Sequence, residues 1–207
     1  MDFSDTFLRD IATHQMHVFR DDGVHRHIRF SQPGTMCMHF DLVTWPGFLC
    51  YTGDMGTYVF RRLNDMFEFF RRPAGRPQFQ IDMRYWAEKL EATDKGDGHK
   101  EFSEDCFRAD VKDYFDQATD DDNEWTAERK SALWKEIELD VLHRLGTDEQ
   151  SAFMALEDFS HDGFQFVDWE RDCKEYTHRF RWCCHALDWA IGVYDASKSQ
   201  TPAAACT

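Results

Sequence analysis

The sequence predicts an α+β fold, in which an N-terminal antiparallel β-meander of about five strands packs against a C-terminal set of about four to five helices. Apolar residues recur with a period close to two between residues 14 and 62, and with a helical period after residue 81. Strands followed by helices are typical of α+β proteins. We expect one domain over residues 1–196, β-rich at 14–62 and helical at 65–195, then a disordered tail at 197–207.

Four turn sequences divide the β-rich half into five strands: DDG at 21–23, SQPGT at 31–35, WPGF at 45–48 and GDMG at 53–56. The last of these lacks the spacing of a phosphate-binding P-loop and does not open a helix, so we interpret it as a hairpin turn. The register that gathers the apolar side chains places these residues on the core face: Met16, Val18, Val24, Ile28, Met38, Phe40, Leu42, Leu49, Tyr51, Tyr58 and Phe60.

The helical half contains four marked segments. Ser103, followed by two acidic residues, begins the first; the second spans about 124–145; Thr147 and Asp148 cap a short third. The last, about 166–195, carries a heptad seam of Trp169, Cys173, Tyr176, Phe180, Cys183, Leu187, Ala190 and Tyr194. This seam either packs within the domain or forms a coiled coil with a partner. Its aromatic and cysteine content favours packing within the domain, as a central buried helix.

The net charge of −15 is unevenly placed along the chain. Residues 1–80 hold nine arginines and nine acidic residues, so the whole excess lies after residue 80. Segment 101–124 alone has ten acidic and two basic residues. Such a surface repels nucleic acid and anionic membranes and attracts basic partners. We therefore expect neither nucleic acid nor a membrane as a direct partner.

Other features indicate an intracellular protein. The seven cysteines are an odd number without a CxxC pair, which favours reduced thiols. The N-terminus does not resemble a signal peptide, and no apolar run of about 18 residues is present. No nucleophile motif stands out, because Cys183, Cys184 and His185 are adjacent on a helix and point in different directions.

Histidines gather on the polar face of the predicted sheet. The same register places His17, His27, His39 and Asp54 nearly opposite one another on four strands, near His25, Asp41 and Thr52. Imidazoles and a carboxylate in such a row are suited to a divalent metal that activates water. The alternative is a solvated polar face, which antiparallel sheets often have.

Two charged clusters allow alternative interpretations. The acidic residues Glu104, Asp105, Asp110, Asp113, Asp116, Asp120, Asp121 and Asp122 are either a solvated helix face or a surface that binds a partner in place of phosphates. The arginines Arg61, Arg62, Arg71, Arg72 and Arg76 form a basic cluster. Pairing with acidic helices explains that cluster more simply than contact with nucleic acid.

Several long strings resemble a family of small proteins encoded by phages, prophages and plasmids of proteobacteria. The strings are FDLVTWPGFLCYTGDMGTYVFRRLNDMFEFFR at 40–71, MHVFRDDGVHRHIRFSQPGT at 16–35, DGFQFVDWERD at 162–172 and EYTHRFRWCCHALDW at 175–189. The resemblance carries no catalytic residues. It implies an accessory protein in the cytoplasm of a bacterial host, of the kind that counters host defences as an anti-CRISPR or anti-restriction protein.

These observations support two hypotheses of function. The first is a non-catalytic anti-defence inhibitor that binds a host protein, such as a nucleic-acid-binding defence complex, through the acidic helices. The second is a small metal-dependent enzyme or ligand-binding domain that uses the histidine face. A structural role in assembly rests on the heptad seam alone, and the sequence does not indicate an oligomeric state.

Overall fold

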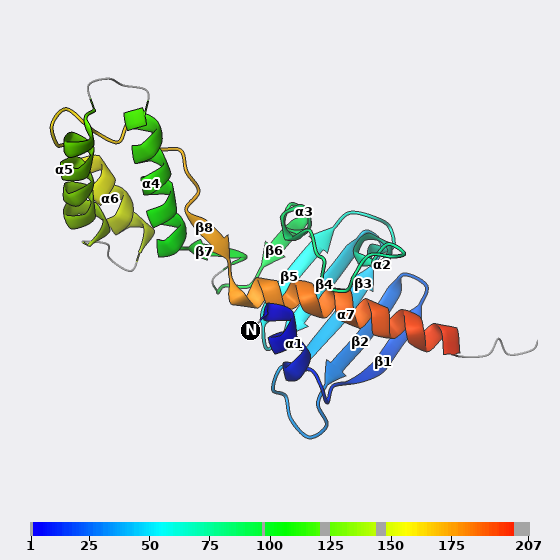
Figure 1. The fold of residues 1–207 in the computed structure, drawn as a ribbon. Coiled ribbons are helices and arrows are strands. Elements are labelled where there is room, and N and C mark those ends of the chain that lie inside the picture. The colour runs from blue at the N-terminus through cyan, green and yellow to red at the C-terminus, as the bar shows by residue number, and fades with distance from the viewer. Residues whose placement is uncertain (1, 97, 121–124, 144–147, 201–207) are drawn as a thin grey trace, which may run out of the picture. The chain divides into compact units, whose positions relative to one another are not determined.

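The computed structural model describes residues 2–96, 98–120, 125–143 and 148–200 and confirms an α+β protein (Figure 1). The chain forms two compact units. Residues 1–99 and 176–207 make up the sheet unit, and residues 100–175 make up the helical unit. The sequence had predicted a single domain without a boundary at residues 99–100 or 175–176. The second boundary was not visible because the predicted last helix, about 166–195, runs across it.

The sheet unit contains a six-stranded antiparallel meander in which strands adjacent in sequence are paired. Five strands lie in the predicted β-rich half: β1 (Gln15–Asp22), β2 (His25–Ser31), β3 (Phe40–Trp45), β4 (Phe48–Gly53) and β5 (Gly56–Arg61). The sixth, β6 (Leu90–Thr93), lies where a helix was expected. That expectation was wrong because β6 satisfies the backbone groups that β5 would otherwise expose as an edge strand.

Glycines fix the tightest turns of the meander. Gly23 adopts a positive φ of 61° between β1 and β2, as predicted. The TGDMG segment is a hairpin turn in which Gly53 pairs with Gly56. A Cβ on Gly53 would lie 2.2 Å from the backbone oxygen of His39, so no other residue fits there without a shift of backbone.

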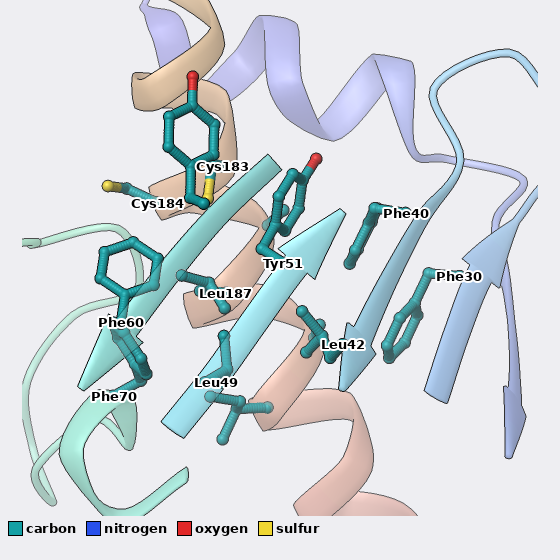
Figure 2. Close-up of a cluster of buried hydrophobic side chains, with 14 of the residues drawn as sticks. Phe30, Phe40, Leu42, Leu49, Tyr51, Phe60, Phe70, Cys183, Cys184 and Leu187 are labelled. Atoms are coloured by element: carbon teal, nitrogen blue, oxygen red, sulfur yellow. The ribbon is translucent and has the colours of Figure 1, made fainter. Parts of the chain in front are cut away.

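One face of the sheet forms the core of this unit, and α7 (His178–Gln200) covers it together with α1 (Phe3–Asp10) (Figures 1 and 2). The rings of Phe30, Phe40 and Tyr51 stack across β2, β3 and β4, with centroids 5.0 and 5.5 Å apart. Of the predicted core face, Ile28, Phe40, Leu42, Leu49, Tyr51, Tyr58 and Phe60 are buried. Val18 is instead 40% exposed, because β1 is an edge strand.

The last helix starts later and ends later than expected. Residues 166–173 are not helical, Asp168 has a positive φ of 51°, and α7 begins only after Thr177, whose hydroxyl accepts the Phe180 N–H at 3.2 Å. Trp169, Cys173 and Tyr176 therefore lie outside the helix that carries the other five residues of the predicted seam, from Phe180 to Tyr194. The remaining seam packs inside the sheet unit, and residues 182–188 are all buried, as a central helix requires. The helix runs on through residues 197–200, which were expected to be disordered, and the rest of the expected tail, residues 201–207, lies outside the described residues.

Two short helices complete the sheet unit: α2 (Met66–Phe70) and α3 (Met83–Ala87). The Asp65 carboxylate caps α2 by accepting the Phe67 N–H at 3.0 Å. The Asp82 carboxylate caps α3 in the same way, by accepting the Tyr85 N–H at 3.0 Å. Their buried aromatic side chains, Phe67, Phe70 and Trp86, join the sheet core.

The helical unit has its own core, formed by α4 (Glu104–Asp120), α5 (Ala127–Ile137), a π-helical turn η1 (Glu138–Leu142) and α6 (Glu149–Asp158). A short ribbon of β7 (Lys100–Phe102) and β8 (Lys174–Tyr176) joins it to the rest of the chain. Ser103 begins α4 as predicted, since its hydroxyl accepts the Cys106 N–H at 3.2 Å. Most of the aromatic residues in and around α4 pack into this core, including Phe107 and Phe115, which are buried.

Throughout the part of the chain that the structure describes, every helix is too short or too polar to cross a lipid bilayer.

Candidate functional site

The outer face of the sheet, opposite the core, carries the predicted histidines, but in a different order. Its rows are set by the strand pairing: His17 lies opposite Arg29, Arg29 opposite Asp41, and Asp41 opposite Thr52. His27 falls in the next row, opposite Val43. A bulge at Phe19 shifts the pairing of β1 with β2, which sequence alternation alone cannot reveal.

Asp41 is the centre of the polar contacts on this face. Its carboxylate accepts hydrogen bonds from Arg29 at 2.7 and 2.9 Å and pairs with His27 Nε2 at 2.9 Å. Burial by itself would raise the pKa of Asp41, but the hydrogen bonds from Arg29 and His27 outweigh it and lower the pKa below its usual value. Asp41 was expected only as a neighbour of the row, and it is the residue that organises the face.

The predicted metal-binding residues do not converge. His17 and His27 each pack against the Phe19 ring, with centroid distances of 4.5 and 4.6 Å. His39 lies before β3, where its Nδ1 is 2.6 Å from the Met36 carbonyl oxygen, and Asp54 accepts the Met38 N–H at 2.9 Å. Among the described residues, no three His, Cys, Asp or Glu side chains are grouped so that they could hold a metal ion.

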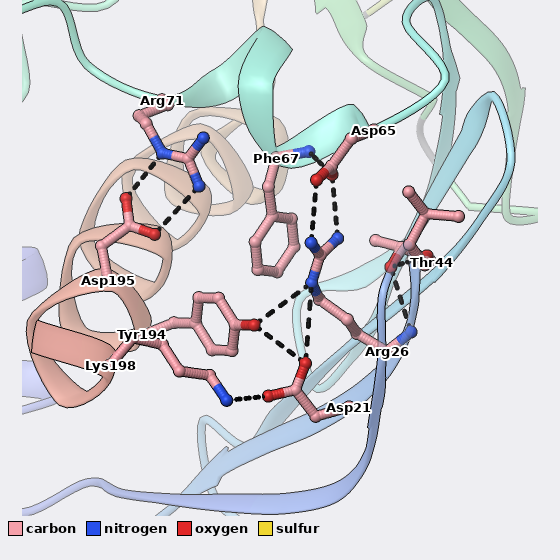
Figure 3. Close-up of polar contacts among 10 residues, drawn as sticks. Asp21, Arg26, Thr44, Asp65, Phe67, Arg71, Tyr194, Asp195 and Lys198 are labelled. Atoms are coloured by element: carbon pink, nitrogen blue, oxygen red, sulfur yellow. Dashed lines mark hydrogen bonds and ion pairs between the residues drawn. The ribbon is translucent and has the colours of Figure 1, made fainter. Parts of the chain in front are cut away.

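The sheet unit also contains a buried charge network that ties its elements together (Figure 3). Arg26, which is 8% exposed, donates two hydrogen bonds of 2.8 Å to Asp65 at the start of α2. The Tyr194 hydroxyl on α7 donates to Asp21 at 2.9 Å and accepts from Arg26 at 3.4 Å. Lys198 pairs with the same Asp21. These contacts join β1, β2, α2 and α7, so the network is structural.

The charge of the molecule is concentrated in the helical unit. Residues 100–175 contain 23 acidic and nine basic residues, a net charge of −14, whereas the sheet unit has 16 acidic and 15 basic residues and a net charge of −1. The boundary between the units is therefore also a boundary of charge. A basic partner would be attracted by the helical unit far more than by the sheet unit.

The predicted acidic row on α4 is largely engaged within the chain. Glu104 pairs with Arg108, Asp110 and Asp113 with Arg171, Asp116 with Lys112, and Asp120 with Lys130. Asp105 is exposed and makes no such contact with another described residue. Asp121 and Asp122 lie outside the described residues. Because basic side chains lie beside most of these carboxylates, the local negative charge of α4 is smaller than the number of its acidic residues suggests.

A second acidic feature of the helical unit was missed in the sequence analysis. A groove of about 390 Å³, which we call the acidic groove, lies along α6 and is lined by Asp140, Ser151, Met154, Ala155, Asp158, Phe159, Ser160 and His161. Met154 is 53% exposed in it. Glu157 and Asp158 form the last turn of α6, which contains no basic residue. The signal in the sequence was the adjacent acidic pair Glu157 and Asp158, about ten residues after the predicted start of the short helix at Thr147 and Asp148.

Comparison with protein-family models, with curated proteins and with solved structures finds no match to this chain. Its function must therefore be inferred from the geometry and charge of the two units.

Proposed function

We propose that the chain is a non-catalytic inhibitor, made by a phage or another mobile element, that binds a host protein in the bacterial cytoplasm. The occupant of its binding surface is a cationic segment of that host protein, such as the nucleic-acid-binding surface of a defence complex. One observation carries the proposal: the helical unit holds acidic residues beside an open groove, at a helix end that disfavours them.

The position of Glu157 and Asp158 is unfavourable for the fold itself. The C-terminal end of a helix carries a partial negative charge, so an exposed carboxylate there costs about 0.3–1 kcal/mol where a lysine would be favourable. The last turn of α4 likewise contains no basic residue and ends in Asp120. Residues that weaken the fold in a surface position are best explained by an interaction outside it.

The acidic groove suits a lysine or arginine side chain of a partner. Met154, Ala155 and Phe159 offer apolar surface to the methylene stem, and the exposed Asp158 at the end of α6 offers a carboxylate to the charged end. A guanidinium or ammonium group forms charge-assisted hydrogen bonds with such a carboxylate. The surrounding charge of −14 speeds the approach of such a partner and repels nucleic acid and anionic membranes.

The test is an affinity pull-down of the tagged protein from bacterial host lysate at low and high salt. We expect a nucleic-acid-processing protein to be retained at low salt and lost at high salt. The double variant Glu157→Lys and Asp158→Lys is expected to lose about tenfold or more in affinity for that protein, while its folding stability stays equal or rises.

The matched control is the double variant Glu88→Lys and Glu91→Lys, which makes the same change of charge at exposed positions of the sheet unit. It is expected to leave binding unchanged. Equal loss of binding in the control and in the groove variant contradicts the proposal, because net charge would then be responsible and the groove would have no specific role.

A second candidate is a ligand-binding or metal-dependent function of the outer sheet face, and the His27–Asp41 contact favours it. A buried carboxylate that orients a half-exposed imidazole is the arrangement of many acid–base pairs. Measuring the metal content of the purified protein, and the uptake of divalent metal by His27→Ala and Asp41→Asn, tests this candidate. Stoichiometric metal that both variants lose supports it, and metal-free protein that takes up none contradicts it.

A further inference from the structure

Two adjoining cavities of the sheet unit share an arginine-rich lining. Their volumes are about 190 and 290 Å³, and both are lined by Arg71, Arg72, Pro73, Arg76 and Asp188. Because they share these residues, we treat them as one cleft, the arginine cleft, which lies between the segment after α2 and the buried helix α7. The cleft is separate from the acidic groove and belongs to the other unit.

The three arginines differ in how far their donors are used. Arg71 donates two hydrogen bonds to Asp195 on α7, at 2.7 and 3.0 Å (Figure 3). Among the described residues, Arg72 bonds through Nε alone, which is 3.3 Å from Asp188. Arg76 is exposed and bonds to no other described residue through its side chain. Asp188 and Asp195 thus balance two guanidinium groups, and the third, together with the Nη atoms of Arg72, remains available to an anion.

The backbone of the segment that carries these arginines is fixed without an anion. Asp188 is 7% exposed and also accepts the Phe79 N–H at 3.0 Å, so it anchors the segment after α2 onto α7. The turn from Pro73 to Arg76 is closed by a backbone hydrogen bond of 3.1 Å and has Gly75 at a φ of 81°. Because the backbone of this segment is ordered in advance, only the side chains lose freedom when a ligand binds.

The other end of the cleft is aromatic. Phe69, Tyr85 and Trp86 line it, and Tyr85 is 42% exposed. Asp82 lies at this end, and within the described part of the chain its Oδ1 accepts the Tyr85 N–H while its Oδ2 makes no hydrogen bond. Arginine forks suit phosphate oxygens, aromatic faces stack on planar rings, and a carboxylate oxygen accepts N–H groups from the edge of a ring.

We propose that the arginine cleft binds a purine mononucleotide, with its phosphate at Arg72 and Arg76 and its base against Tyr85. Guanine carries two adjacent N–H groups, N1–H and the N2 amino group, on one edge, whereas adenine has the N6 amino group alone, so Asp82 makes guanosine monophosphate the preferred probe. This site is independent of the partner-binding function proposed above, because no residue of the acidic groove takes part in it.

The experiment is calorimetric titration of the full chain with guanosine monophosphate, guanosine and inorganic phosphate. Saturable one-to-one binding of the mononucleotide is expected, with guanosine and phosphate each weaker by about tenfold or more, because each lacks half of the contacts. No saturable binding of the mononucleotide at millimolar concentration overturns the proposal, as does equally tight binding of phosphate alone.

Two variants locate the site and one controls for charge. Arg76→Ala and Tyr85→Ala are each expected to weaken mononucleotide binding by about tenfold while the thermal unfolding midpoint stays close to that of the wild type. Arg84→Ala removes the same charge from an exposed position of α3 outside the cleft and is expected to bind normally. Equal weakening by Arg76→Ala and Arg84→Ala overturns the assignment, since it indicates unspecific attraction.

Discussion

At the scale of single residues, the carboxylates of this protein have two different roles. Asp41 and Asp65 lie in the sheet unit, are hydrogen-bonded to arginines, and have pKa values lowered by those partners against the opposing effect of burial. Glu157 and Asp158, in the helical unit, are exposed at the end of a helix. The first pair stabilises the fold, and we assign the second pair to binding. Burial and an arginine partner thus distinguish the carboxylates that stabilise the fold from those that we assign to binding.

The lowered pKa of Asp41 predicts a specific dependence of stability on pH. Because the carboxyl ionises more readily when folded, its contribution is present above the unfolded-state pKa and is lost as pH falls through the lower, folded value. We expect Asp41→Asn to lower the free energy of unfolding by about 1–3 kcal/mol at neutral pH. Urea unfolding of both proteins at pH 7 and at about pH 3 measures the difference, which is expected to shrink at the lower pH. A difference that does not change with pH contradicts this explanation.

At the scale of elements, buried polar contacts decide how the helices attach to the sheet. Hydrophobic packing alone brings α7 onto the sheet, but it is not directional. The fork between Arg26 and Asp65 fixes α2 against β2, and Tyr194 fixes the C-terminal part of α7 against Asp21 (Figure 3). Arg26 also lies over the Phe67 ring, with its guanidinium carbon 4.5 Å from the centroid. The network therefore selects one arrangement among those that the apolar core allows.

Removing one partner of this fork is expected to destabilise the sheet unit strongly. Asp65→Ala leaves the Arg26 guanidinium buried without its carboxylate and removes the cap of α2, with an expected loss of about 3–5 kcal/mol in the free energy of unfolding. The double variant Arg26→Met with Asp65→Leu is expected to lose less, because no charge is left buried and unpaired. Denaturant unfolding compares the two. A double variant less stable than Asp65→Ala contradicts this view of the network.

At the scale of the whole molecule, the helical unit is an insertion between His99 and Tyr176 of the sheet unit. The chain leaves and re-enters the sheet unit at adjacent points, since the Thr177 N–H donates to the His99 carbonyl oxygen at 3.1 Å. Each unit has its own apolar core. The strongly negative helical unit is thus inserted into the nearly neutral sheet unit at a single place, where the chain ends of the sheet unit lie side by side.

This arrangement predicts that the sheet unit folds without the insertion. Replacing residues 100–175 by a short Gly-Ser linker is expected to leave a protein that unfolds cooperatively, because the ends to be joined already lie within hydrogen-bonding distance. Circular dichroism and thermal unfolding test this. The shortened protein is expected to lose the salt-sensitive host partner and to retain mononucleotide binding. A variant that fails to fold shows that the units depend on each other.

The sequence by itself determined five of the six strands of the sheet and most of its core face. Apolar and polar residues alternate along the strands that contain Ile28, Leu42, Tyr51 and Phe60, so only one register buries all the apolar side chains on one face. Gly23 and Gly56 mark turns that need a positive φ. It also determined the central buried helix, because residues 182–188 are apolar on nearly every side. These features depend on local patterns, which one chain displays directly.

Only the tertiary structure decided the division into two units, the histidine order and the two candidate sites. A single bulge at Phe19 displaces β1 relative to β2, and periodicity cannot show where an extra residue is accommodated. The arginine cleft joins Arg72 to Asp188, 116 positions apart. The acidic groove combines η1 with α6. Such contacts depend on how elements pack, and packing is set by the shapes of side chains distant in sequence, which no local pattern records.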